Sequence, residues 1–192
     1  MKILIIDTTS PLAALTLCVG DKQQRVPFTD RYNQSRDLPK FLQRLLRRDH
    51  SSLGALDAIA VVTGPGSFTS IRVGVSFANA LAYGEGIPAF GISLFDWART
   101  VSQTVPLVVD GGSSGIFTQK GTKTTRYTQV EYAQLPQKAR RAIIGLDAAS
   151  LVALVIKRAP GAIKKYRGFI PVVPFYGSKP NITTPKRSRK KR

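Results

Sequence analysis

Cysteine, histidine and long apolar runs are scarce or missing in this chain of 192 residues. Cys18 is the only cysteine, which excludes an intramolecular disulfide and a cysteine-based zinc site. His50 is the only histidine, so a metal site built on a histidine pair is excluded as well. No apolar run approaches the roughly 20 residues of a membrane-spanning helix, and Asp7 interrupts the first apolar run too early for a secretory signal. We expect a reduced, cytoplasmic protein that binds no metal and no membrane.

Acidic residues are also few, since 11 Asp and Glu face 29 Lys and Arg, and the formal net charge is +18. The excess is uneven, because residues 157–192 contain 12 Lys or Arg and no acid. A basic segment of this kind attracts polyanions by releasing their counterions. We expect residues 178–192 to be a disordered basic tail that either contacts RNA or remains solvated. Its candidate RNA-contacting residues are Lys186, Arg187, Arg189, Lys190, Lys191 and Arg192.

The first fifty residues predict strands followed by a helix. Apolar, β-rich runs indicate strands at residues 2–6, 12–19 and 24–28. One apolar helical face predicts a helix over residues 35–48, with Ser35 or Asp37 as its cap and Pro39 in its first turn. The residues of that face are Leu38, Phe41, Leu42, Leu45 and Leu46.

From Gly54 onward, strands alternate with helices. The predicted elements are a strand at 56–62, a helix at 68–83, a strand at 87–92 and a helix at 94–101. Strands that first form hairpins and then alternate with helices indicate an α/β fold, with a mixed sheet covered by helices.

The pattern changes past residue 103. We expect a strand at 105–110, a flexible loop at 111–115, a hairpin at 116–130 that turns at Gly121, a strand at 139–146 and a helix at 148–158. Proline and glycine after residue 160 leave no compact core to build there. We therefore divide the chain into a domain over 1–103, a small second lobe over 104–177 and the basic tail over 178–192.

A glycine-rich segment before the second helix is the most informative motif. A strand, a glycine turn and a helix N-terminus together can receive an anion, which makes Gly64, Gly66 and Ser67 candidate phosphate-binding residues. The segment is neither a Walker A motif nor Gly-x-Gly-x-x-Gly. We favour the alternative of a sharp strand-to-helix turn, in which Pro65 fixes φ and Ser67 or Thr69 caps the helix.

Carboxylates follow two of the predicted strands. Asp7, Thr8 and Thr9 stand where the actin and sugar-kinase fold begins its first phosphate loop, so they are candidate nucleotide-binding residues. An Asp turn held by local hydrogen bonds explains the same residues, and we favour it. Asp110 could bind a cation or cap a turn, and we favour the cap.

Several stretches together resemble the TsaB (YeaZ) family, which serves in making threonylcarbamoyladenosine in tRNA. The most specific is the ungapped string over residues 56–74, and the others are 3–9, 35–39, 91–94, 108–110 and 174–180. The resemblance implies an actin-like ATPase fold of the ribonuclease-H type, with a mixed five-stranded sheet, flanking helices and a shortened second lobe. Ser70 stands where the family usually has glycine.

The resemblance also implies a non-catalytic subunit, which scaffolds and activates the metal-bearing catalytic paralogue TsaD. The complex transfers a threonylcarbamoyl group to N6 of adenosine 37 in tRNAs that read ANN codons. ATP and the metal are expected in partner subunits, with no cofactor on this chain, and a TsaE-like ATPase joins. The alternatives are a small actin-fold ATP-dependent phosphotransferase and a basic RNA-binding module.

Family interfaces use two helices, which match residues 35–48 and 68–83 here, and a homodimer could use the same face. Small residues spaced four apart, at 74, 78 and 82, suit close packing of a partner helix. The predicted partner-binding residues are Leu38, Phe41, Leu45, Phe68, Ile71, Arg72, Gly74, Val75, Ala78 and Ala82.

Overall fold

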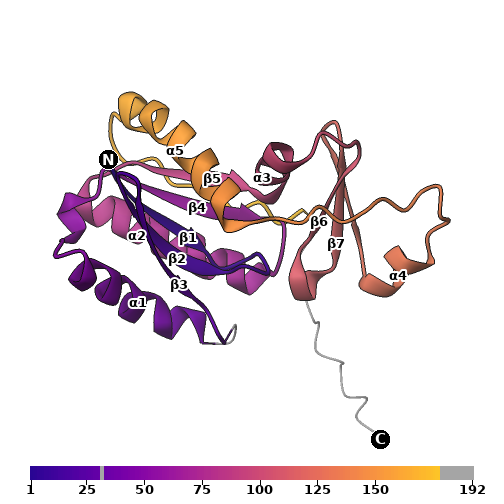
Figure 1. Ribbon diagram of the computed structural model, residues 1–192, viewed down its shortest axis with the longest axis horizontal. Helices are drawn as coiled ribbons and strands as arrows, with labels where there is room; N and C mark the ends of the chain where they lie inside the picture. Colours follow the sequence, from indigo (N-terminus) through magenta and orange to yellow (C-terminus); the bar gives the residue numbers. More distant parts are fainter. Residues whose placement is uncertain (31–32, 178–192) are drawn as a thin grey trace, which may run out of the picture.

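A mixed five-stranded sheet forms the centre of the computed structural model, which describes residues 1–30 and 33–177 (Figure 1). Its strands run in the order β3-β2-β1-β4-β5. β1, β2 and β3 are antiparallel neighbours, whereas β4 pairs in parallel with both β1 and β5. The bounds are β1 (Lys2–Asp7), β2 (Ala14–Val19), β3 (Lys22–Pro27), β4 (Ala58–Gly64) and β5 (Ala89–Ser93). The predicted mixed sheet is confirmed.

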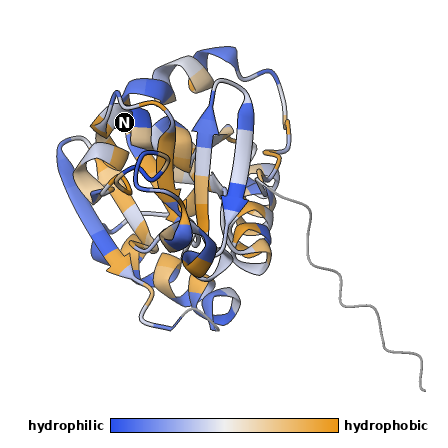
Figure 2. Cartoon of the chain, turned by 90° about the vertical axis from the view of Figure 1, so that its right-hand side faces the viewer, coloured by the Kyte–Doolittle hydropathy of each residue, from blue (hydrophilic) through white to orange (hydrophobic). Residues whose placement is uncertain are grey.

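Helices cover both faces of this sheet. α1 (Gln34–Arg48) and α2 (Phe68–Glu85) pack on one face, and α3 (Leu94–Val101) and α5 (Ala148–Lys165) pack on the other. Because side chains alternate along a strand, Ile3 and Ile5 join the core under α3 and α5, while Leu4 and Ile6 join the core under α1 and α2. In Figure 2, hydrophobic stretches gather in the middle of the molecule between the helices.

α1 begins earlier than predicted. Asn33 occupies its N-cap position without a side-chain cap, and Ser35 and Asp37 lie inside the helix. Gln34 explains the earlier start, because its buried side-chain amide donates to the carbonyl of Thr8 at 2.9 Å and anchors this end to β1. The predicted cap was wrong, and Pro39 consequently lies in the second turn of the helix.

A second, three-stranded sheet follows α3, in the order β6-β7-β8. It contains β6 (Leu107–Asp110), β7 (Ile116–Lys120) and β8 (Lys123–Tyr127), and the predicted hairpin turn at Gly121 is confirmed. The predicted flexible loop at 111–115 is instead a tight turn, because the N–H of Gly111 donates to the carbonyl of Gly115 at 2.8 Å. The ring of Phe117 fills the space beside Gly111.

Two further predictions for this region fail. Residues 139–146 form no strand; only the N–H of Ile144 reaches β6, at 2.8 Å from the carbonyl of Val108. The short helix α4 (Gln129–Gln134) was not predicted, although a capping box between Thr128 and Glu131 opens it. That pattern was available in the sequence as Thr-x-x-Glu.

The segment after α5 folds back onto the first sheet. α5 continues past Pro160 to Lys165, and residues 166–177, here named the C-terminal strap, follow it. The N–H of Phe175 donates to the carbonyl of Thr63 at 2.9 Å, and the ring of Phe175 packs edge-on to Phe95. As predicted, the strap builds no core of its own, but it adds Phe175 to the core beneath α3 and α5.

The first sheet is thus completed by residues from the far end of the chain. α5 contacts β1, β4 and β5, although the predicted division at residue 103 placed it in the second lobe. The second sheet and α4 form the part that projects from the rest in Figure 1. Residues 178–192, the predicted basic tail, lie outside the described residues. Within the described chain, no helix is long and apolar enough to cross a membrane.

Candidate functional site

Two motifs that are far apart in the sequence meet where β1 and β4 end. The hydroxyl of Thr8 donates to the carbonyl of Ser70 in α2 at 2.7 Å. Gly66 lies against the side chain of Thr9 and Gly74 lies against Thr8, and a Cβ at either glycine would be too close to the threonine. The absence of a side chain at these two glycines therefore lets the turn after β1 fit against the start of α2.

Asp7 forms the predicted Asp turn. Its Oδ1 accepts from the backbone N–H groups of Thr9 and Ser10, at 2.9 and 3.0 Å, and its Oδ2 accepts from the Ser10 hydroxyl. Burial raises the pKa of Asp7, and the hydrogen bonds from Ser10 and Thr9 oppose that rise. The side chain is only 2% exposed, so the carboxylate serves the turn rather than a ligand at the surface.

The glycine turn between β4 and α2 is closed. Thr63, Gly64 and Gly66 are buried, and the carbonyl of Phe175 in the strap lies where a Cβ of Gly64 would stand. Ser67 is the N-cap of α2, and its hydroxyl accepts from the N–H of Ser70 at 3.4 Å. The favoured reading as a sharp, capped turn is confirmed.

This packing determines whether the candidate phosphate-binding residues are accessible to a phosphate. The structure brings all of them together, but Asp7, Thr8, Thr9, Gly64 and Gly66 are buried and only Ser67 is half-exposed. They therefore form no open anion site in this conformation, because the chain's own side chains and strap fill the place that a phosphate would need.

The predicted partner-binding residues divide into two groups. Those that are buried in the chain's own core are Leu38, Leu45, Ile71, Gly74, Val75, Ala78 and Ala82. Phe41 is half-buried and stacks on Phe28, with ring centroids 5.3 Å apart. The small residues of α2 let it approach Thr8 and β4 of its own chain closely. Only Phe68 and Arg72 of the predicted set are exposed, so the predicted face requires correction.

The exposed stripe of α2 is the surface that remains available. Phe68 is 37% exposed, the guanidinium of Arg72 lies 5.3 Å from its ring centroid, and the ring of Tyr176 lies 4.6 Å from it. A shallow depression on this stripe is lined by Phe68, Thr69, Arg72, Val73 and Ser76. We name these five residues the outer face of α2. Its members 69, 72, 73 and 76 follow helical spacing, so periodicity could have found Thr69, Val73 and Ser76.

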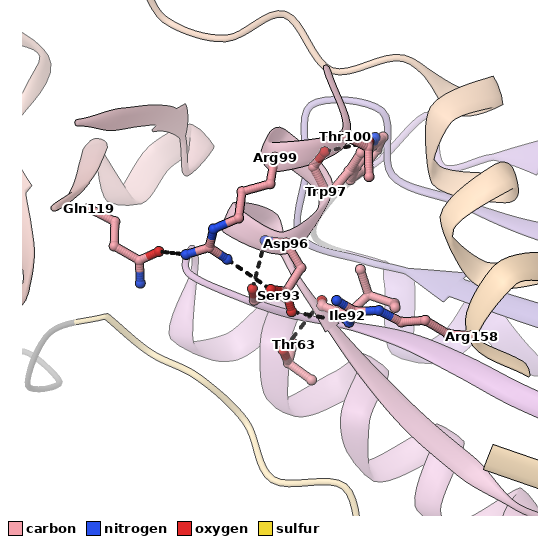
Figure 3. Close-up of polar contacts among 9 residues, drawn as sticks. All are labelled: Thr63, Ile92, Ser93, Asp96, Trp97, Arg99, Thr100, Gln119 and Arg158. Atoms are coloured by element: carbon pink, nitrogen blue, oxygen red, sulfur yellow. Dashed lines mark hydrogen bonds and ion pairs between the residues drawn. The ribbon is translucent and has the colours of Figure 1, made fainter. Parts of the chain in front are cut away.

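A polar network joins the two sheets on the opposite side (Figure 3). Asp96 in the first turn of α3 accepts from Arg99 at 2.9 Å and from Arg158 of α5 at 3.2 Å. Arg99 also donates to the side chain of Gln119 in β7. Burial, the largest single influence on the pKa of Asp96, raises it, but Arg158, Ser93 and Arg99 together hold that pKa below its usual value. The carboxylate thus ties α3 to α5, and Arg99 extends the tie to the second sheet.

The remaining candidates have structural explanations. Asp110 caps a turn, as we favoured, by accepting from the N–H of Gly112 at 2.7 Å. Cys18 is buried, and burial raises the pKa of its thiol to about 11, which makes it unreactive. Across residues 1–30 and 33–177, no group of three His, Cys, Asp or Glu is arranged to hold a metal ion.

Comparisons with known proteins place this geometry in a family. A family model described as TsaD, tRNA N6-adenosine threonylcarbamoyltransferase, matches residues 26–166. The "tRNA threonylcarbamoyladenosine biosynthesis protein TsaB" of Escherichia coli is 35% identical over 94 residues, which are 48% of this chain and 40% of that protein. The protein of the same name from Haemophilus influenzae is 33% identical over 94 residues, covering 48% of this chain and 39% of its own. The match thus spans about two fifths of these relatives' length.

A solved structure agrees with the fold. YeaZ from Pseudomonas aeruginosa matches with a TM-score of 0.63 and 16% identity, over 86% of this chain and 98% of that one. The predicted actin-like fold of the ribonuclease-H type is confirmed by this likeness and by the family model. Because that family model matches most of the chain, the chain belongs to the family that the TsaD model describes, and TsaB proteins are among the curated relatives to which it is similar.

Proposed function

We propose that this chain is a non-catalytic subunit of the tRNA threonylcarbamoyladenosine machinery. It scaffolds and activates a metal-bearing TsaD-like paralogue, which transfers the threonylcarbamoyl group to N6 of adenosine 37 in tRNAs reading ANN codons. The names of the curated relatives support this assignment. The complex works in the cytoplasm, and a TsaE-like ATPase joins it.

The closed ends of β1 and β4 support a role without chemistry of its own. Both carboxylate oxygens of Asp7 accept hydrogen bonds within its own turn, and the strap covers Gly64. A nucleotide would have to displace these contacts before its phosphates reached the N-terminus of α2. We therefore assign ATP and the metal to the partner subunits, and the phosphotransferase alternative loses its proposed site.

The outer face of α2 is the observation that carries the partner assignment. It combines an exposed aromatic ring with an arginine, and these two residue types are enriched in the cores of protein interfaces. The residues beneath it are already packed against β4, so a partner would meet a rigid helix and little ordering entropy would be lost on binding. In the absence of the paralogue, a second copy of the chain can occupy the same face.

A pair of matched variants tests this assignment. Ser76→Arg puts a long cation into the depression on the outer face, whereas Ala153→Arg adds the same charge to the exposed side of α5. Each tagged chain is co-expressed with the TsaD-like paralogue of its own organism, and the recovered paralogue and the threonylcarbamoyladenosine content of tRNA are measured. We expect Ser76→Arg to lose both and Ala153→Arg to keep both. Recovery of no paralogue by the unmodified chain contradicts the proposed function, and equal recovery by both variants contradicts the chosen face.

A further inference from the structure

A cleft with a volume of about 490 Å³ lies between edge strand β5 and the C-terminal strap. Pro88, Phe90 and Val172 contribute apolar wall, while Lys165 and Tyr166 line the part that follows α5. This volume falls within the range of small-molecule sites. Unlike the turn between β4 and α2, this cleft is open in the folded chain.

Several cations on α5 and just after it have no ion-pair partner in the described part of the chain, and one of them, Lys165, lines the cleft; the carboxylate in the lining, Asp96, is paired with Arg99 and Arg158. Arg158 is paired with Asp96, but no ion pair among the described residues includes Lys157, Lys164, Lys165 or Arg167. Arg167 donates only to the neutral carbonyls of residues 164 and 166. The helix dipole favours basic residues in a last turn, but it offers only about half a negative charge. The cluster therefore retains a strong attraction for a polyanion.

Exposed aromatic rings stand beside these cations. Tyr83 at the end of α2 is 73% exposed and meets Phe169 of the strap edge-on, with centroids 5.3 Å apart. Phe169 is 38% exposed and lines the same cleft as Lys165 and Tyr166. Proteins that bind single-stranded nucleic acid combine cations for the phosphates with rings on which bases stack.

β5, which forms the floor of the cleft, also presents backbone N–H and C=O groups. β5 is the last strand of its sheet, and its only ladder is with β4. No backbone hydrogen bond among the described residues joins β5 to strap residues 166–174. The outward N–H and C=O groups of β5 can therefore bond the edge of a base that enters the cleft.

We propose that this cleft binds a nucleotide of single-stranded RNA, with phosphates on Lys164, Lys165 and Arg167 and the base against Phe169. The inference rests on the proposed function for the source of that RNA, a loop or end of tRNA. The physical basis of the inference is independent of that function, because it consists of the cations near the end of α5, the exposed aromatic rings and the edge of β5. An anionic membrane would use the cations but would not need a cleft, and an acidic peptide would not need the rings.

Binding of a fluorescein-labelled single-stranded RNA of about ten nucleotides, followed by anisotropy across a salt series, tests the cleft in the full chain. Lys164→Glu with Lys165→Glu removes two phosphate contacts, and Lys22→Glu with Lys40→Glu makes the same charge change at exposed positions on β3 and α1. The slope of log affinity against log salt falls by roughly 0.7 for each lost contact. We expect the first pair to lower the slope by about 1.4 and the control pair to leave it nearly unchanged. Equal effects of the two pairs overturn the site.

Phe169→Leu separates stacking from charge. Leucine keeps an apolar contact with Tyr83 but removes the ring, so affinity should fall roughly 5- to 150-fold with the salt slope unchanged. Thermal unfolding of each variant confirms that it is folded. If Phe169→Leu leaves the affinity for RNA unchanged, the placement of a base in the cleft is wrong. Binding of phosphatidylglycerol vesicles and of poly-glutamate is measured on the same variants. If the variants lose either of these but keep RNA binding, the placement is also wrong.

Recovery of the TsaD-like paralogue, measured on the same variants, keeps the two proposals apart. We expect every cleft variant to recover the paralogue as the unmodified chain does, because no residue that lines the cleft belongs to the outer face of α2. Normal recovery with unaltered RNA binding overturns the cleft alone. Failed recovery by the unmodified chain overturns the proposed function and leaves the anisotropy result to judge the cleft.

Discussion

Adding a single methyl group at Gly74 tests whether the small residues of α2 serve the chain's own fold. An ideal Cβ at Gly74 would stand 2.4 Å from Thr8 Oγ1 and 3.4 Å from Thr8 Cβ. Relieving this overlap costs about 1–3 kcal/mol by overpacking, and it disturbs the Thr8–Ser70 hydrogen bond, worth about 1 kcal/mol. The better helix propensity of alanine returns about 1 kcal/mol. Gly74→Ala should therefore lower the free energy of unfolding by roughly 1–3 kcal/mol.

Gly84→Ala is the matched control on the same helix. A Cβ at Gly84 meets no atom within 4 Å, so this variant should gain roughly 0.5–1 kcal/mol from propensity alone. Urea unfolding followed by fluorescence of Trp97, the single tryptophan, measures both values. In a Thr8→Ala background, Gly74→Ala should become neutral or stabilising, because the obstructing hydroxyl is gone. If Gly74→Ala is as stable as Gly84→Ala in the unaltered background, the contact between α2 and the turn after β1 is wrong.

Three further substitutions test other contacts, the first two by the same urea assay and the third by limited proteolysis. Thr9→Val should raise stability by about 1 kcal/mol, because Thr9 Oγ1 is buried without a hydrogen-bond partner among the described residues; a loss instead would mean that the hydroxyl is satisfied. Asp96→Asn should cost about 1 kcal/mol at neutral pH. Because the folded pKa of Asp96 lies below its usual 3.8, its contribution is present above that pH and is lost as the pH falls through the folded value; a cost that persists in acid would refute the ionic role. Asn79→Ala removes both bonds to the backbone of Val172, at 2.9 and 3.0 Å, and should speed proteolysis within the strap; unchanged cleavage would show that other contacts hold the strap.

The sequence was sufficient where local pattern and tertiary packing agree. The helix over 94–101 has the predicted bounds, since Ser93 caps it and four of its apolar residues, Leu94, Phe95, Trp97 and Ala98, are buried in one core. Strand β4 of the sheet was also predictable, because every residue of β4 is buried and residues 58–62 are a plain apolar run.

The identity of the packing partner was not predictable from local pattern. A stripe of glycine and alanine indicates that something approaches closely, but the same stripe serves a partner helix or the chain's own sheet. At α2 the approaching groups are Thr8 and β4, and the exposed stripe lies on the other side. The strap is a second example, because the contact of Asn79 with Val172 spans 93 residues and leaves no local periodicity.

The contact between the rings of Tyr176 and Phe68 means that the surface presented by α2 is assembled from two segments far apart in the chain. A nascent or truncated chain that stops before the strap lacks the ring beside Phe68. Recognition through this surface would therefore report that synthesis of the described chain has reached Tyr176.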